Sequence, residues 1–155
     1  MIRQLLYRSG QLYEFTTQDM LRLLLQARAF NAQAGIGGML LHQDGLFMQL
    51  LEGPVAAVDR LYARIASDPR HCEVRLLVRA ERHMPLLPSW RMAWAEAPVD
   101  GELPVFAGVE TDHTALDLLE RAGSDRVAAT MRAFLLGAPV PNGGLGCAKL
   151  MERVL

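Results

Sequence analysis

A glutamine and a tyrosine are the residues best suited to chemistry in this chain. Gln49 lies in the apolar run Leu46–Leu51, where strand alternation places it on the same face as Phe47. A buried amide that makes no hydrogen bonds costs roughly 1–3 kcal/mol, so Gln49 needs a partner. The hydroxyl of Tyr7, at the end of the apolar segment Ile2–Tyr7, needs one too. A Tyr–Gln hydrogen bond between neighbouring strands would satisfy both groups, with or without a ligand on the amide.

A second amide, Asn31, ends the apolar stripe of a predicted helix. Thr16 and Thr17 are suitable N-caps for the run 18–33, and Gly35 is the expected C-cap. The apolar residues recur at spacings of three and four, so they share one helix face with Asn31: Met20, Leu23, Leu24, Ala27 and Phe30. Asn31 therefore faces the buried side, although a helix-terminal amide also explains it when it is considered alone.

The sequence supports neither ordinary catalysis nor nucleic-acid binding. It has no nucleophile elbow, P-loop or G-x-G-x-x-G motif, and its histidines have no metal-ligand spacing: His42, His71, His83 and His113. The formal net charge of −1 provides no basic footprint for nucleic acid. No signal peptide or membrane-spanning apolar run is present, and Cys72 and Cys147 form no C-x-x-C pair. We therefore expect a soluble protein of the reducing cytoplasm, without nucleic-acid or membrane partners.

Four polar residues gather where a second predicted helix ends: Arg64, Asp68, Arg70 and His71. Such a group is typical of a solvated helix end, although the two arginines could hold an anionic tail. Further along, Trp90 and Met92 follow a loop that contains Pro85 and Pro88. Considered singly, a tryptophan and a methionine are more often core residues than functional ones.

The apolar pattern predicts the elements that position these residues. Five strands are expected, at Ile2–Tyr7, Ile36–His42, Leu46–Leu51, Val74–Ala80 and Trp90–Ala95. Two helices are expected, over 18–33 and from Pro54 to Asp68, while Gln43-Asp44-Gly45 forms a hairpin turn. This order predicts an α+β fold, a ferredoxin-like βαββαββ sheet with two helices on one face. In such a sheet the strand of Tyr7 is central and adjacent to the strand of Gln49.

The last third of the chain predicts a smaller, helical unit. Residues 111–122 and 125–136 have the pattern of two short amphipathic helices, with Asp112 and Ser124 as possible caps. We expect them to pack on the uncovered face of the sheet, which divides the chain into a domain at 1–96 and a C-terminal helical extension at 97–155. The roughly sixty residues after Ala95 are too few for a cyclase or phosphodiesterase domain.

Several short patterns occur together in one order along residues 1–95. They are Tyr7; Asn31 before Gly35-Ile36-Gly37-Gly38; Phe47-Met48-Gln49-Leu50-Leu51-Glu52-Gly53; Asp68-Pro69-Arg70-His71; and Trp90-Arg91-Met92. In their order and spacing, these residues resemble the BLUF family of blue-light receptors that use flavin. One departure is Gly37, where that family usually has threonine.

The resemblance implies a flavin site between the two helices of the domain. Leu23 and Ile65 would pack the flavin ring, and Asn31 would bond its pyrimidine edge. The ribityl and phosphate groups would be contacted by the polar cluster: Arg64, Asp68, Arg70 and His71. Tyr7 and Gln49 would be the photoactive pair, and the change would reach the fifth strand, where Trp90 or Met92 exchanges environment. FAD is the expected cofactor, with FMN or riboflavin as alternatives.

The implied function is that of a non-enzymatic blue-light receptor. Light would cause electron and proton transfer from Tyr7 and a rearrangement of Gln49, giving a reversible red-shifted state. A downstream effector protein, or self-association within a homo-oligomer, would read that state through the C-terminal helices. Two alternatives stay open: a light-insensitive ferredoxin-like interaction module, and a small flavin-dependent redox enzyme, for which no acid–base pair is evident.

Overall fold

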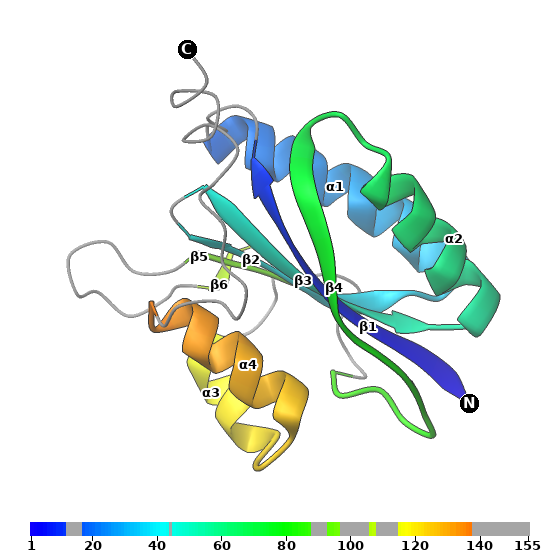
Figure 1. Cartoon of the computed structure of the whole chain (residues 1–155), viewed down its shortest axis with the longest axis vertical. Helices are drawn as coiled ribbons and strands as arrows, with labels where there is room; N and C mark the ends of the chain where they lie inside the picture. The colour runs from blue at the N-terminus through cyan, green and yellow to red at the C-terminus, as the bar shows by residue number, and fades with distance from the viewer. Residues whose placement is uncertain (12–16, 44, 88–92, 97–105, 108–114, 138–155) are drawn as a thin grey trace.

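A six-stranded sheet separates two pairs of helices in the computed structural model (Figure 1). The structure describes residues 1–11, 17–43, 45–87, 93–96, 106–107 and 115–137. The elements are β1 (Ile2–Gln11), α1 (Thr17–Ala34), β2 (Gly37–Gln43), β3 (Leu46–Gly53), α2 (Val55–Ala66), β4 (His71–Arg82), β5 (Ala93–Glu96), β6 (Phe106–Ala107), α3 (Ala115–Arg121) and α4 (Arg126–Leu135). The predicted α+β class with a ferredoxin-like order of elements is confirmed.

The strands are arranged β4-β1-β3-β2-β5-β6, so β1 lies between β3 and β4. It pairs antiparallel with both, and β2 pairs in parallel with β5. The first strand was expected to end at Tyr7, but β1 continues through Ser9 and Gly10 to Gln11. Both residues have partners on β3, Phe47 and Leu46, and this pairing overrides their turn preference.

Three other boundaries differ from the expected ones. β4 extends beyond Val74–Ala80 at both ends, because it pairs with β1 from Ile2 to Gln11. β6, which was not among the expected strands, forms an antiparallel pair with β5. β5 starts at Ala93, and the earlier part of the predicted fifth strand, with Trp90 and Met92, lies outside the described residues.

The end of α1 is set by its glycine cap. Gly35 has φ of +71°, and the Ile36 amide donates to the Asn31 carbonyl over 2.9 Å. This six-to-one bond is the signature of a Schellman motif, in which a left-handed residue closes the helix. Asn31 is thereby fixed in the last turn of α1, and its side chain is only 2% exposed.

Each face of the sheet carries its own hydrophobic core. Toward α1 and α2, the buried cluster consists of Leu5, Tyr7, Ile36, Leu40, Phe47, Leu51 and Val58. Toward α3 and α4, it includes Leu6, Met39, Leu41, Met48 and Leu50 from the strands, with Leu119, Val127, Met131, Phe134 and Leu135 from the helices. Alternating residues of a strand therefore belong to different cores, as the period of two requires.

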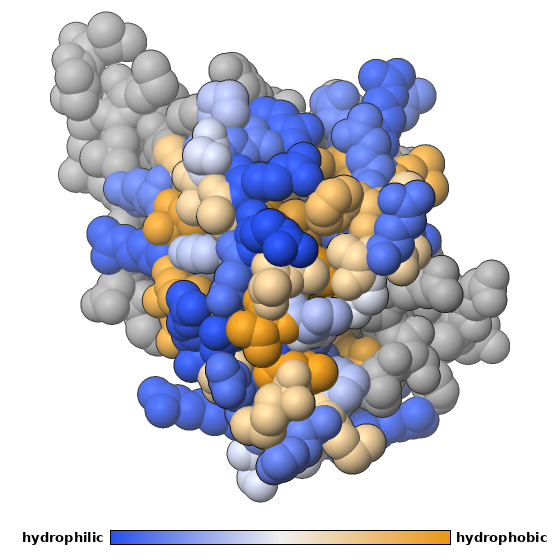
Figure 2. Space-filling view, turned by 90° about the vertical axis from the view of Figure 1, so that its right-hand side faces the viewer, coloured by the Kyte–Doolittle hydropathy of each residue, from blue (hydrophilic) through white to orange (hydrophobic). Residues whose placement is uncertain are grey.

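Ion pairs hold α2 to the strands beneath it. The Arg3 guanidinium contacts Asp59 of α2 at 3.0 Å and Glu81 of β4 at 3.2 Å, while Arg79 also reaches Asp59 at 3.2 Å. Figure 2 shows one side of the molecule, where hydrophilic side chains separate small apolar groups. In the described part of the chain, no helix is long and apolar enough to cross a membrane. Cys72 is disulfide-bonded.

The second C-terminal helix is capped and tied to the sheet by one carboxylate. Asp125 Oδ1 accepts from the amides of Val127 at 2.8 Å and Ala128 at 3.2 Å, and its Oδ2 lies 2.6 Å from Arg82 Nη1 at the end of β4. The expected cap, Ser124, was therefore off by one residue; the expected Asp112 cap lies outside the described residues. Burial opposes ionisation of Asp125, but the bonds to Arg82 and the helix amides hold the pKa of its carboxyl below the ordinary value.

Replacing Asp125 by alanine should destabilise the fold by about 1–2 kcal/mol, the usual cost of a lost N-cap. Because the folded state lowers this pKa, the Asp125 contribution is present above the unfolded pKa of about 4 and disappears as pH falls through the folded value. Urea unfolding at pH 7 and at low pH measures both effects. Ser124→Ala is the matched control and should change stability by less than about 0.5 kcal/mol; equal losses in the two variants would contradict the assigned cap.

Candidate functional site

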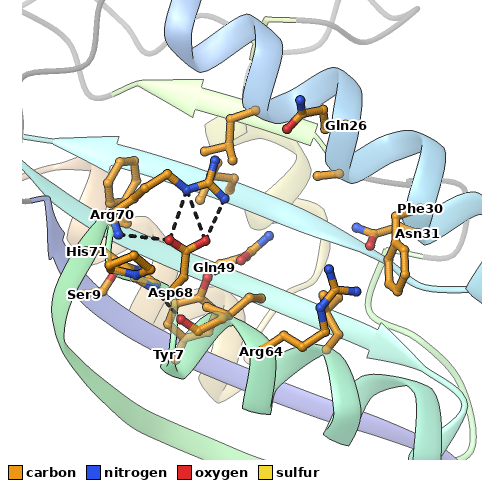
Figure 3. Close-up of a pocket in the computed structure, with 17 residues that line it drawn as sticks. Tyr7, Ser9, Gln26, Phe30, Asn31, Gln49, Arg64, Asp68, Arg70 and His71 are labelled. Atoms are coloured by element: carbon orange, nitrogen blue, oxygen red, sulfur yellow. Dashed lines mark hydrogen bonds and ion pairs between the residues drawn. The ribbon is translucent and has the colours of Figure 1, made fainter.

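A cavity of about 600 Å³ opens between α1 and α2 above the central strands (Figure 3). Its walls are mostly apolar and are formed by Leu23, Ala27, Leu40, Phe47, Leu61 and Ile65. Polar side chains line the remainder: Tyr7, Ser9, Gln26, Asn31, Gln49, Arg64, Asp68, Arg70 and His71. Such a cavity suits a flat, largely apolar ligand that has polar groups along its edge and at one end.

Tyr7 and Gln49 are joined by a hydrogen bond at the floor of this cavity. They are direct cross-strand partners on β1 and β3, and both side chains are buried. The Tyr7 hydroxyl donates to Gln49 Oε1, so the amide oxygen faces the phenol and the amide nitrogen is directed away from it (Figure 3). Burial, with smaller effects of Tyr62 and Asp68, raises the pKa of Tyr7 far above its ordinary value. Tyr7 thus keeps its proton across the physiological pH range.

Asn31 reaches the cavity from the last turn of α1. Its side chain is buried, yet within the described residues the Asn31 amide makes no hydrogen bond. Because the amide lines the cavity, its hydrogen-bonding groups are open to a ligand there. The amide is therefore placed to bond a ligand in the cavity.

Two cationic side chains stand at the exposed rim of the cavity. Arg70 donates from Nε and Nη2 to the Asp68 carboxylate, with the shortest contact at 2.6 Å. The hydrogen bond from Arg70 holds the pKa of Asp68 below its ordinary value. On α2, the Arg64 guanidinium lies 4.9 Å from the ring centroid of Phe30 on α1, so this cation–π pair bridges the two helices.

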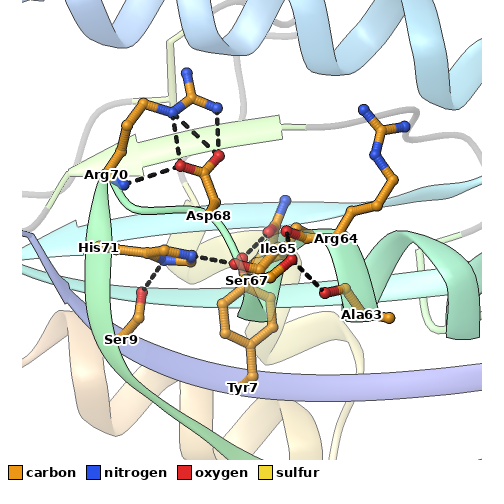
Figure 4. Close-up of polar contacts among 10 residues, drawn as sticks. Tyr7, Ser9, Ala63, Arg64, Ile65, Ser67, Asp68, Arg70 and His71 are labelled. Carbon is orange, nitrogen blue, oxygen red and sulfur yellow. Dashed lines mark hydrogen bonds and ion pairs between the residues drawn. The ribbon is translucent and has the colours of Figure 1, made fainter.

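His71 fastens three elements at one end of the cavity (Figure 4). Its Nε2 lies 2.5 Å from the Ile65 carbonyl of α2, and its Nδ1 lies 2.9 Å from Ser9 Oγ of β1. Because a carbonyl can only accept, Nε2 carries a proton, and in the neutral ring Nδ1 accepts from the Ser9 hydroxyl. β4 reaches this position through register shifts opposite Leu6–Tyr7 and Arg8–Gly10, near Glu73 with φ of +49°.

The family model described as "BLUF: Sensors of blue-light using FAD" matches residues 2–93, more than half of the chain. The chain belongs to the BLUF family. It is therefore a flavin-based blue-light sensor, as the resemblance in its motifs implied.

Curated relatives contain this BLUF domain within much longer chains. The photoactivated adenylate cyclase subunit beta of Euglena gracilis is 40% identical over 92 residues, which cover 59% of this chain and 11% of that protein. The blue light- and temperature-regulated antirepressor BluF of Escherichia coli (strain K12) is 34% identical over 74 residues, covering 48% of this chain and 18% of that protein. The chain thus spans only a small part of the length of these relatives.

Solved BLUF structures share the fold described here. The dark-state structure of the BLUF protein BlrB has a TM-score of 0.59 and 30% identity, and the match covers 61% of this chain and 72% of that chain. Klebsiella pneumoniae BlrP1 with FMN and cyclic diGMP has a TM-score of 0.68 and 29% identity, with 88% of this chain and 35% of that chain covered.

The structure brings together nine of the residues that the sequence predicted for the BLUF site. Tyr7, Leu23, Asn31, Gln49, Arg64, Ile65, Asp68, Arg70 and His71 all line the cavity. The other two, Trp90 and Met92, lie outside the described residues. Direct flavin contact by the nine lining residues stays a prediction, as does the photoactive role of Trp90 and Met92.

Some lining residues were not predicted as part of the site. Ser9 is two residues after Tyr7, so the period of two on β1 places both on one face. Gln26 is one helical turn before Phe30 on α1. Strand periodicity would have predicted Ser9 if the first strand had been extended past Tyr7. Helix periodicity would have predicted Gln26 if the apolar face of α1 had been interpreted as a cavity wall.

The residues present fit a flavin. The apolar walls suit the faces of an aromatic ring, and the Asn31 amide on the cavity wall can bond a polar ring edge. The arginines at the rim suit an anionic tail. The cavity size also falls within the roughly 300–1,000 Å³ range of preformed small-molecule sites.

Asn31→Ala should weaken flavin retention, because it removes the amide that has no protein partner among the described residues. One lost hydrogen bond of about 1.4 kcal/mol corresponds to a roughly tenfold higher dissociation constant. Titration of flavin fluorescence against the apoprotein measures the change. Gln33→Ala removes an exposed amide from the same helix and should leave the dissociation constant unchanged; unchanged affinity in Asn31→Ala would exclude the assigned contact.

Proposed function

We propose that this BLUF domain senses blue light through the Tyr7–Gln49 pair and signals without enzymatic activity of its own. The observation that carries the proposal is the hydrogen bond from the Tyr7 hydroxyl to Gln49 Oε1 at the floor of the cavity. It joins a redox-active phenol to an amide that can both accept and donate a proton. Further support comes from the family match over residues 2–93.

Different groups of the described residues would bind the ring faces, the ring edge and the polar tail of a flavin. Leu23 and Ile65, on α1 and α2, stand on opposite sides of the cavity and would pack the ring faces. Asn31 and Gln49 supply amides for the ring edge. Arg64 is the favoured partner for phosphate, because Arg70 is already bound to Asp68. Asp68, Arg70 and His71 would contact the polar tail.

The photochemistry depends on moving one proton between two side chains. Bound flavin supplies an oxidant when it absorbs blue light. Tyr7 can give up an electron at low cost only if its phenolic proton leaves as well, and Gln49 Oε1 is the hydrogen-bonded acceptor. The Gln49 amide can pass a proton on from Nε2, and the electron and a proton then return to Tyr7, which leaves the amide rotated or tautomerised with no net oxidation. No covalent bond between protein and flavin forms in this sequence, so the change reverses in darkness.

We propose FAD as the cofactor, in line with the family description. FMN is a real alternative, because the similar BlrP1 structure is a complex with FMN. Both carry phosphate, for which the Arg64 and Arg70 guanidinium groups stand at the rim of the cavity. The proposal of cofactor identity is tested by extracting the flavin from the purified protein and identifying it by chromatography.

Output is proposed to pass from the domain at 1–96 to the C-terminal extension at 97–155. α3 and α4 pack against the sheet face opposite the cavity, so the sheet itself links sensor and output. A downstream protein, or a second copy of this chain, would read a change in their packing. The relatives favour a protein effector, since one is a photoactivated cyclase subunit and another an antirepressor.

The absorption spectrum of the flavin-loaded protein before and after a blue flash tests the sensing step. A small red shift that decays in darkness is the expected outcome. Irreversible bleaching would instead indicate redox turnover, and no response in flavin-loaded protein would reject light sensing.

Tyr7→Phe should keep flavin bound and abolish the red shift, because the variant removes the donor to Gln49 while preserving the ring. Tyr62→Phe is the matched control: its ring lies 5.7 Å from that of Tyr7, but Tyr62 does not line the cavity. Flash spectroscopy of both variants at equal flavin loading gives the comparison. A normal red shift in Tyr7→Phe would refute the assigned proton donor.

A further inference from the structure

Glu52 is a buried carboxylate for which the sensing mechanism has no use. It is 2% exposed and lies near the end of β3, three residues after Gln49. Its direct partners on the neighbouring strands are Gln4 and Gly37. Because side chains alternate along a strand, Glu52 faces the α3–α4 side of the sheet while Gln49 faces the cavity.

Three N–H groups converge on this carboxylate. Glu52 Oε1 accepts from Gln4 Nε2 at 2.8 Å and from the Leu86 amide at 2.7 Å, and Oε2 accepts from the Leu87 amide at 3.1 Å. Two of these donors are backbone groups from a segment 34–35 residues further along the chain. Hydrogen bonds to a carboxylate are shorter and stronger than bonds between neutral groups.

The anchored segment, Leu86–Leu87, packs in the core that the sheet shares with the C-terminal helices. Leu86 and Leu87 follow β4 and precede β5, and they belong to neither strand nor helix. Glu52 therefore accepts the hydrogen bonds that a neighbouring strand would accept if these two amides lay in the sheet. The Leu87 side chain is buried in the cluster that includes Leu119 of α3 and Met131 of α4, and Leu86 packs against that cluster.

We infer that Glu52 is a positioning residue that transmits the state of β3 to the core shared with α3 and α4. The inference rests on the proposed function, since it supplies the route from Gln49 to the helices. A movement of β3 caused by Gln49 reaches the Leu86–Leu87 backbone through the Glu52 carboxylate. The Leu87 side chain then carries that movement into the helix core. Strand pairing links β3 to β5 through β2, whereas the Glu52 bonds join β3 directly to the segment that precedes β5.

Glu52→Gln tests this link with little change of volume. A glutamine offers one acceptor oxygen, and its NH₂ group cannot accept from the second backbone amide. In the dark, hydrogen exchange of the Leu86 and Leu87 amides in the flavin-loaded full chain should become about tenfold faster or more. The flash-induced red shift should persist, whereas light-induced exchange differences in α4 should fall severalfold or vanish.

Two variants separate transmission from general destabilisation. Glu81→Gln removes an exposed carboxylate that contacts Arg3 and should leave the α4 light response intact. Gln4→Met removes the side-chain donor to Glu52 but retains both backbone bonds, so stability should fall while the α4 response remains. A loss of that response in Gln4→Met equal to the loss in Glu52→Gln would overturn the role of the backbone bonds.

The outcomes distinguish this inference from the sensing proposal. An undiminished α4 light response in folded Glu52→Gln would refute transmission through Glu52, even with a normal red shift. A wild-type protein without a red shift would refute the sensing proposal and transmission with it, while dark exchange at Leu86 and Leu87 would still test the anchoring. If Glu52→Gln does not fold, hydrogen exchange of the wild-type protein tests the inference. The exchange rates of the Leu86 and Leu87 amides should then change in light together with those of α4, and a change in α4 alone would refute it.

Discussion

The antiparallel register between β1 and β3 is the constraint on which the rest of the structure depends. It places Tyr7 opposite Gln49, and a slip of one residue would move one of the two side chains to the other face of the sheet. Gly38 supports this arrangement from β2: it has φ of +143°, and a Cβ there would lie 1.8 Å from the Leu50 carbonyl oxygen. No other residue type fits that close approach without displacing β3, so the hydrogen bond at the cavity floor depends on a glycine one strand away.

Around that register, several of the lining residues come from the ends of helices and strands. Asn31 comes from the last turn of α1, Arg64 and Ile65 from the last turns of α2, and His71 from the first position of β4. Each end is fixed by a local device, such as the Schellman bond at Ile36 or the Ser9–His71–Ile65 bonds. The site is therefore rigid on its floor, where strands pair, and depends on individual side-chain bonds at its rim.

Apolar alternation and helix periodicity were sufficient to predict the sheet order around Tyr7 and Gln49 and the face of α1 that carries Asn31. Features set by distant partners could not be predicted. Ser124 and Asp125 are both good N-cap residues, and the ion pair with Arg82 selects the second. Glu52 belonged to a recognised motif, but its partners are mainly backbone amides, which carry no residue-type signal. The extra length of β4 depends on register shifts, one near Glu73, that no local pattern indicates.

The two-sided use of the central strands has an evolutionary consequence. Leu5, Tyr7, Phe47 and Leu51 belong to the core beside the cavity, whereas Leu6, Met48 and Leu50 belong to the core beneath α3 and α4. Selection can therefore alter the second set to suit a new partner while the first set, and the colour that the protein detects, stays constant. One sheet can in this way serve lineages that share a sensor and differ in what they regulate.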